Sequence, residues 1–168
     1  PALPVTDVSK ARINKRWTVP TDSGFSSFSV AGPQAFTVVT RGGKETLVAL
    51  DVKSGRELWA QALDDAKYDG GGNSGTRDNQ GGDGARSTPT VNDGKVYAIG
   101  SQVTVFCFDA KDGKKIWTHD VQKANGGENI RWQNAASPVI DGDILLLAGG
   151  GKGQALLGVD KKTGAVKW

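Results

Sequence analysis

One phrase occurs three times along this chain of 168 residues and limits its possible folds more than any other feature. Each copy consists of Asp, three residues, Gly, three residues and Trp, within residues 49–59, 107–117 and 158–168. The residues of the three frames are Asp51, Gly55 and Trp59, then Asp109, Gly113 and Trp117, then Asp160, Gly164 and Trp168. Self-similarity at a spacing of a few tens of residues is typical of repeat proteins in which each copy builds one supersecondary unit.

A second phrase precedes each copy, and β-rich runs alternate with turn residues between the two phrases. The second phrase occupies residues 27–30, 87–91 and 136–140. In the second unit the runs cover residues 88–91, 95–99, 103–108 and 114–118, which predicts four strands joined by hairpins. The third unit repeats this order, with its second strand at residues 144–148.

The predicted strand at residues 144–148 is apolar throughout, which indicates burial on both faces. In an antiparallel chain in which we expect no helix, such a sheet must lie between other sheets. The sequence therefore predicts an all-β fold, a β-propeller of four-stranded antiparallel blades. Residues 18–59, 60–117 and 118–168 are expected to form three blades, with a long loop rich in Gly and Asp at residues 60–86 and an N-terminal segment at residues 1–17.

The frame residues have structural roles in such blades. Each Asp ends the third strand, where its carboxylate can accept hydrogen bonds from the following turn, and each Gly supplies the positive φ of that turn. Each Trp lies on the outer strand and is expected to pack against the neighbouring blade. Trp17 ends a partial earlier copy, so residues 1–17 are expected to supply the outer strand of a closing blade. None of these residues is predicted to be catalytic.

The repeats resemble those of the PQQ-like, or quinoprotein, β-propeller family, whose blades end in an Ala-x-Asp-x-x-Thr-Gly-x-x-x-Trp phrase with a docking tryptophan. The resemblance covers residues 14–168 and is strongest at residues 49–59, where Ser54 replaces Thr, and at residues 158–168. It implies a ring of about six to eight blades in a protein that is periplasmic, secreted or otherwise extracytoplasmic. The family contains both quinone-dependent dehydrogenases and non-catalytic scaffolds of the BamB type.

A dehydrogenase of this family is expected to carry an adjacent Cys pair over PQQ and a Ca²⁺ held by Glu, Asn and Asp, with an Asp as base. Cys107 stands alone in a predicted strand, where it is expected to be a small buried hydrophobic residue. Another branch uses a His base, but His119, two residues after Trp117, is expected to be a surface residue that leads into a loop. The sequence therefore predicts no cofactor, with PQQ and Ca²⁺ expected only under the alternative of a dehydrogenase fragment whose redox residues lie elsewhere.

The composition excludes several other classes of protein. One Cys and one His leave no disulfide within the chain and no metal site built on Cys or on a His pair. The net charge of +3 comes from lysines spread through short turns, which favours solvated turns over a nucleic-acid surface. No apolar run approaches the ~20 residues of a membrane helix, so no membrane span is predicted.

Two long connections between the predicted blades are expected to emerge on one face and to carry the candidate ligand-binding residues. Arg86 precedes one inner strand, and Arg131 with Trp132 precedes the next. These side chains could hold an anionic or aromatic ligand at the channel mouth; the alternative is that they order their own loops. The Gly-rich stretch at residues 69–86 contains oxygen ligands but departs from calcium-loop spacing, so no metal site is predicted.

Three blades do not close a ring, because propellers contain about four to eight. Something must cover the end blades, either further blades of a longer natural chain or the blades of a second copy. The leading hypothesis is a non-catalytic scaffold that binds a protein partner or a ligand, as part of a longer extracytoplasmic protein or a membrane-associated complex. The alternative is a fragment of a PQQ-dependent quinoprotein dehydrogenase.

Overall fold

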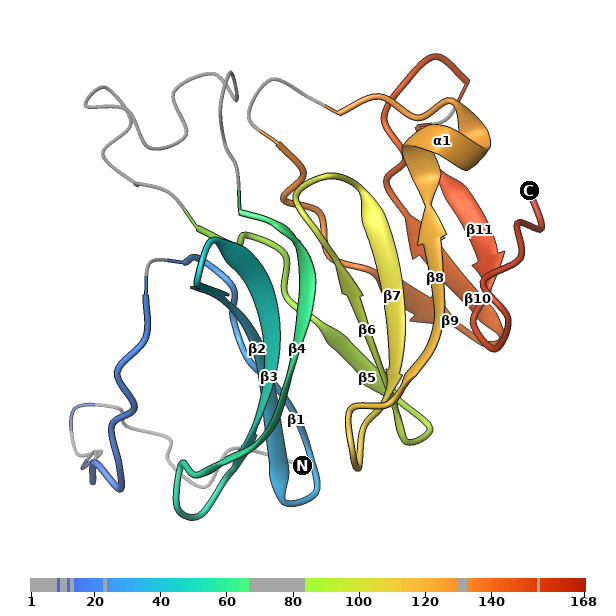
Figure 1. The fold of residues 1–168 in the computed structure, drawn as a ribbon. Coiled ribbons are helices and arrows are strands. Elements are labelled where there is room, and N and C mark those ends of the chain that lie inside the picture. Colours follow the sequence, from blue (N-terminus) through green and yellow to red (C-terminus); the bar gives the residue numbers. More distant parts are fainter. Residues whose placement is uncertain are drawn as a thin grey trace.

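The computed structural model describes residues 9, 12, 14–22, 24–66, 84–129, 133–153 and 155–168. Along these residues the strands form three separate antiparallel sheets, accompanied by one short helix. Figure 1 shows the three sheets standing side by side in chain order, each facing the next. The prediction of β-propeller blades is confirmed, with one strand fewer in the third sheet.

Each sheet is a meander in which every strand pairs with its neighbour in the sequence. The first sheet contains β1 (Ser29–Ala31), β2 (Gln34–Arg41), β3 (Lys44–Asp51) and β4 (Glu57–Asp65). The second contains β5 (Thr90–Asn92), β6 (Lys95–Ile99), β7 (Thr104–Asp109) and β8 (Lys115–Asp120). The third contains β9 (Val139–Asp141), β10 (Ile144–Leu147) and β11 (Leu157–Asp160).

The third sheet departs from the prediction of four strands. Residues 165–168 do hydrogen-bond to β11, where the Asp160 N–H donates to the Ala165 carbonyl (2.8 Å) and the Gly158 N–H donates to the Trp168 carbonyl (2.9 Å). The paired stretch is so short that it forms only an isolated bridge, between Val159 and Val166. The sheet therefore consists of three strands and a short paired segment.

A helix that the sequence did not predict follows β8. Asp120 caps the N-terminus of α1 (Val121–Asn125), because its carboxylate accepts a hydrogen bond from the Lys123 N–H (3.0 Å). Gly126 ends the helix at a φ of 65°. Five residues are too few to produce an apolar helical periodicity in the sequence. β4 and β8 also continue beyond the frame tryptophans, so the connections between sheets are shorter than predicted.

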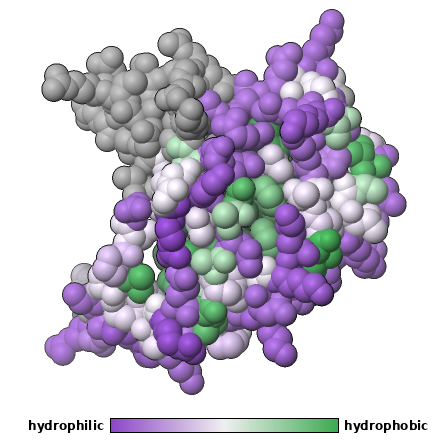
Figure 2. Space-filling model, in the orientation of Figure 1, coloured by the Kyte–Doolittle hydropathy of each residue, from purple (hydrophilic) through white to green (hydrophobic). Residues whose placement is uncertain are grey.

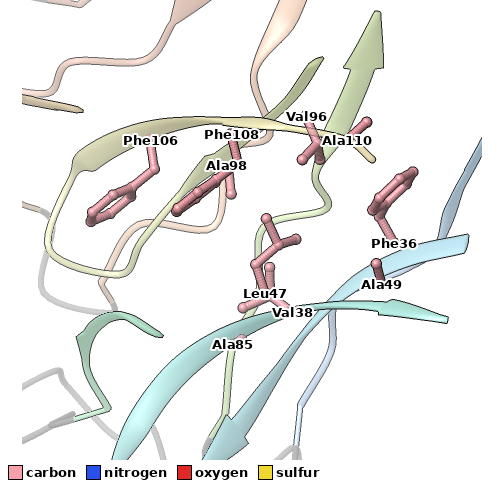
Figure 3. Close-up of a cluster of buried hydrophobic side chains, with 10 residues drawn as sticks. All are labelled: Phe36, Val38, Leu47, Ala49, Ala85, Val96, Ala98, Phe106, Phe108 and Ala110. Atoms are coloured by element: carbon pink, nitrogen blue, oxygen red, sulfur yellow. The ribbon is translucent and has the colours of Figure 1, made fainter. Parts of the chain in front are cut away.

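Two apolar layers hold the three sheets together. Figure 3 shows the first, in which side chains of β6 and β7 face side chains of β2 and β3. The second layer, between the second and third sheets, contains Tyr97, Ile99, Val103, Val105, Cys107, Val121, Leu145, Leu147, Leu157 and Val159. Apolar burial of this kind contributes about 25 cal/mol per Å² of surface removed from water. These layers are the main attraction between the sheets.

The apolar strand β10 is buried on one face only. Leu145 and Leu147 are buried in the layer against the second sheet, whereas Ile144 and Leu146 are half-buried. The prediction of burial on both faces is wrong for this strand, because in the described part of the chain a sheet lies on one side of it only.

The Asp and Gly of each frame shape the turn after the third strand. Each frame Asp accepts a hydrogen bond of 2.8 to 2.9 Å from a backbone N–H two or three residues later. The Ser54 hydroxyl and N–H, in that order, hold the pKa of Asp51 below its ordinary value. Each frame Gly has a φ between 72° and 75°, a conformation that disfavours residues with a side chain.

Candidate functional site

Trp–Gly contacts join each sheet to the next one. The ring of Trp59 covers Gly113 of the second sheet, where an added Cβ would lie 2.7 Å from the ring. The Trp59 indole N–H also donates to the Ala110 carbonyl (3.1 Å). Trp117 makes the same contact with Gly164 of the third sheet. Glycine is therefore needed at these turns both for its φ and for the ring above it.

The two remaining tryptophans differ from this pair. Trp17 covers Gly55 of the first sheet and donates to the Val52 carbonyl (2.9 Å), as a tryptophan of a preceding sheet would. The outer strand expected here is absent from residues 14–17, which pair with no other strand, and most of residues 1–13 lie outside the described part. The ring of Trp168 instead covers Gly158 of its own sheet, and the residue is 60% exposed.

Side chains of the second repeated phrase connect the inner strands of neighbouring sheets. In each contact a hydroxyl or N–H of one sheet binds a hydroxyl or a carbonyl of the next. The pairs are Ser27 with Thr88 (3.0 Å), Thr88 with Ser137 (2.9 Å), Ser29 with Pro89 and Thr90 with Pro138. Val139 occupies the corresponding position of the third sheet, is 57% exposed and has no hydroxyl. The hydroxyl series therefore ends at the third sheet.

Replacing Thr90 with valine will lower the free energy of unfolding by about 1 to 2 kcal/mol, because the Pro138 carbonyl loses its donor while the side-chain volume is kept. Val139→Thr is the matched control at the corresponding, exposed position, and we expect it to change stability by less than about 0.5 kcal/mol. Urea unfolding followed by tryptophan fluorescence measures both variants. Equal effects would show that the hydroxyl series does not stabilise the junction.

Two carboxylates meet at the junction of the first and second sheets. Glu45 of β3 is 2% exposed, and its Oε2 accepts a hydrogen bond from the Ser101 N–H (2.7 Å). Oδ2 of Asp64, on β4, is buried without a hydrogen-bond partner. A Cβ on Gly100 would overlap Asp64 Oδ2 and lie 3.2 Å from Glu45 Oε2, so the two carboxylates are crowded together. Burial, followed by the charge of Glu45, raises the pKa of Asp64 to about 6.

Sequence reasoning missed this carboxylate pair, although the repeat contains a signal for it. Counted from the frame Asp and Trp, Glu45 and Asp64 correspond to Val103 and Gln122 of the second unit. Acidic residues at positions that are uncharged in the next copy indicate a feature specific to the first sheet. Thr104 of the second sheet hydrogen-bonds to Asp64 and opposes the rise in its pKa. The carboxylate pair of the first sheet therefore takes part in the contact with the second sheet.

The arrangement of repeated sheets agrees with the comparison to known protein families. A family model described as outer membrane protein assembly factor BamB matches residues 5–168. The chain belongs to this family of PQQ-like propeller repeats. No curated protein matches it. Because the match extends over almost the whole chain, the three sheets are blades of this family.

Solved structures of the same fold include both enzymes and an assembly factor. A quinohemoprotein alcohol dehydrogenase from Pseudomonas putida is 21% identical with a TM-score of 0.64, over 89% of this chain and 21% of the enzyme. A europium-containing methanol dehydrogenase is 18% identical with a TM-score of 0.63, over 96% and 27%. BamB from Moraxella catarrhalis is 22% identical with a TM-score of 0.51, over 86% and 34%. The chain thus spans between a fifth and about a third of these proteins.

The candidate ligand residues of this PQQ-like chain are only partly described. The guanidinium of Arg86 lies over the ring of Phe25, 5.0 Å from its centre, and the Phe25 N–H donates to the Ala85 carbonyl (2.6 Å). Arg86 therefore contacts a segment of the first blade that lies outside its own loop. Arg131 and Trp132 lie outside the described residues, as does most of the Gly-rich stretch. Whether Arg86 meets Arg131 and Trp132 at a channel mouth stays a prediction.

The residues that the enzyme alternative would need have other partners. Cys107 is fully buried in the apolar layer between the second and third blades, and burial raises the pKa of its thiol to about 11, which disfavours the reactive thiolate. The His119 ring lies 2.6 Å from Asn125 Oδ1 in α1. Among the described residues, no three His, Cys, Asp or Glu side chains gather as a metal site would require. The same part of the chain contains no helix long and apolar enough to cross a bilayer.

Proposed function

We propose that the chain is a non-catalytic propeller module that binds a protein partner within a longer extracytoplasmic protein or complex. The observation that carries this proposal is the unequal use of the Trp–Gly contacts. The rings of Trp59 and Trp117 each contact a glycine of the next blade. Trp17 contacts the first blade and, among the described residues, belongs to no sheet, and Trp168 is exposed. We therefore expect other β-structure to pack against the two ends of this stack of sheets.

Exposed apolar side chains support the same proposal. Phe28 and Val30 of the first blade are more than half exposed, as are Val139 and Leu156 of the third. In Figure 2, apolar side chains reach the surface along the edge where the third sheet lies, as well as nearer the centre of the face. Apolar surface of this kind at the end of a sheet stack is expected to be covered by a partner or by further blades.

Co-purification of the tagged chain from the extracytoplasmic fraction of its source, with mass spectrometry of what is retained, tests this function. The matched control is the double variant Phe28→Asp and Val30→Asp, which makes exposed apolar surface charged while leaving the buried layers unchanged. We expect a partner that the control fails to retain. A chain that retains nothing and unfolds cooperatively as a monomer would contradict the proposal.

A second candidate, a fragment of a quinoprotein dehydrogenase, is favoured by the alcohol and methanol dehydrogenases among the similar folds. The described residues do not fit a quinone site of the kind that the resemblance implies, because the single cysteine is buried between two blades and has no adjacent cysteine. Addition of PQQ and Ca²⁺ to the full-length natural protein tests this candidate. A quinone absorbance band with dye-coupled alcohol oxidation would support it, and an unchanged spectrum would count against it.

A further inference from the structure

A repeated pair of positions lies where neighbouring blades meet. The hairpin position is the last residue of each inner strand, where it pairs with the first residue of the next strand, and it is occupied by Ala31, Asn92 and Asp141. The turn position directly follows each frame Asp and is occupied by Val52, Ala110 and Lys161. In a meander both positions lie at the same end of a blade, so the hairpin position of one blade can meet the turn position of the next.

The first junction is uncharged at these two positions. Ala31 packs against the apolar layer that contains Ala110, and Ala110 is 6% exposed. The residues that follow Ala31, Gly32 and Pro33, carry no charge either. Gln34 Nε2 donates to the Ala110 carbonyl (2.9 Å), which adds a hydrogen bond to the same contact. An apolar hairpin position is therefore matched by an apolar turn position.

The second junction is charged at the same two positions. Lys161 is 8% exposed, and its Nζ donates to Asn92 Oδ1 (2.9 Å) and to Asp93 Oδ2 (3.0 Å). A buried ammonium group is costly unless hydrogen-bond acceptors and an opposite charge surround it. The second blade supplies both to the lysine of the third blade. Side-chain chemistry at the hairpin position and the turn position is therefore matched at both junctions.

The hairpin of the third blade carries a negative charge on a face that no described sheet covers. Along β9, Ile140 packs into the layer against the second blade, whereas Asp141 is exposed on the opposite face. Figure 1 shows this blade at one end of the stack. Asp141 occupies the position of Asn92, and Asp143 pairs with Lys162 of its own blade (3.5 Å). Among the described residues, the Asp141 carboxylate has no ion-pair partner.

A second copy of this chain does not fit that face. In a head-to-tail stack, its first blade would bring the uncharged Val52 opposite Asp141. The carboxylate would then be buried without a partner, which opposes association. Trp17 also covers Gly55 of the first blade, so this glycine is not open to Trp168 of another copy. The occupant must therefore differ from the first blade at its turn position.

We propose that the exposed face of the third blade docks a further blade of the same longer protein, and that Asp141 selects a blade with a lysine at its turn position. The inference rests on the scaffold function proposed above, in which the chain is part of a longer protein. The fold leaves room for further blades, since the chain spans 21% to 34% of the similar dehydrogenases and BamB. A lysine opposite Asp141 repeats the contact of Lys161 with the second blade. Val139, which is 57% exposed on the same face, supplies apolar surface beside the pair.

Carbodiimide cross-linking of the full-length natural protein, followed by digestion and mass spectrometry, tests this inference. The reagent joins a carboxylate to an amine that it contacts directly. We expect a cross-link between Asp141 and a lysine that directly follows the Asp of another Asp-x-x-x-Gly-x-x-x-Trp frame. The pair of Asp93 and Lys161, 3.0 Å apart, is the internal positive control. An equal mixture of unlabelled and heavy-isotope-labelled protein distinguishes a cross-link within one chain from one between two copies.

Two variants of Asp141 separate its role from that of surface charge. Asp141→Asn should remove its own cross-link and keep that of Asp93 with Lys161. Asp141→Lys places two cations together and should lower the folding equilibrium constant of the full-length protein by at least about 10-fold in urea unfolding. Glu128→Lys makes the same change in net charge at an exposed residue after α1, and we expect an effect of less than about 2-fold.

Several results would overturn the inference. A cross-link from Asp141 to a second copy or to a separate protein would assign this face to another occupant, and a missing cross-link beside an intact control would remove the lysine. Equal effects of Asp141→Lys and Glu128→Lys would show that Asp141 selects nothing. Each of these results leaves the proposed scaffold function standing. A natural protein without further blades would instead defeat its placement within a longer protein, and the inference with it.

Discussion

Replacing Gly113 with alanine will lower the free energy of unfolding by about 2 to 5 kcal/mol, whereas the same change at Gly94 will cost about 1 to 2 kcal/mol. Both glycines have similar φ values, 75° and 70°, so the conformational cost of a side chain is the same. They differ in their surroundings. A Cβ on Gly113 would lie 2.7 Å from the ring of Trp59, and a Cβ on Gly94 would meet nothing within 4 Å. The difference between the two variants isolates the ring contact.

A double-mutant cycle identifies the partner of the added methyl group. Trp59→Leu alone removes the ring and its hydrogen bond to the Ala110 carbonyl, and it is expected to destabilise the chain strongly. Combined with Gly113→Ala, it should cost less than the sum of the two single changes, because the methyl group then has no ring to displace. Urea unfolding provides the four free energies. Strict additivity, or equal losses for the Gly113 and Gly94 variants, would contradict the contact.

The blade architecture could be predicted because it depends on residues that act on turns and strands close to them in the sequence. Asp109 and Gly113 shape the turn after the third strand of their blade, and the frame tryptophans Trp59 and Trp117 mark the outer strands β4 and β8. Strand pairing in the second blade follows from hairpins whose turns are visible in the sequence. The prediction of a fourth strand was wrong for the third blade, because the paired segment at residues 165–168 is so short that it gives only an isolated bridge.

The candidate site could not be predicted to the same extent, because its parts meet across blades. Glu45 and Asp64 lie on the paired strands β3 and β4 of the first blade, and the contacts that bury them come from Gly100 and Ser101 of the second blade. Arg86 could be identified as a candidate because it precedes an inner strand, but its stacking on Phe25 is a long-range contact.

Replacing Asp64 with asparagine will stabilise the chain at pH 8 by about 1 to 2 kcal/mol, a value that allows for solvent screening of a half-buried side chain, and will change little at pH 4. Burial, and then the charge of Glu45, raises the pKa of Asp64 to about 6, while Asp120 and Asp65 act in the same direction more weakly. The amide cannot ionise, so it removes the charge that this site disfavours.

The direction of the pH dependence follows from proton binding. Between the ordinary pKa of an aspartate, about 3.9, and the raised value near 6, the folded chain holds a proton at Asp64 that the unfolded chain releases. Stability from this group is therefore present below pH 4 and lost as the pH rises to about 6. The Asp64→Asn variant has no such loss, so the difference in unfolding free energy should grow across this window and then remain constant.

Urea unfolding of both proteins at several pH values between 4 and 8 measures this difference, with Asp141→Asn on exposed β9 as the matched control. The control should show no comparable rise, because Asp141 is exposed and far in sequence from the carboxylate pair. A difference for Asp64→Asn that is independent of pH would mean that the carboxylate is ionised without cost at the junction. The crowding of Asp64 and Glu45 over Gly100 would then have to be relieved by a movement between the first and second blades.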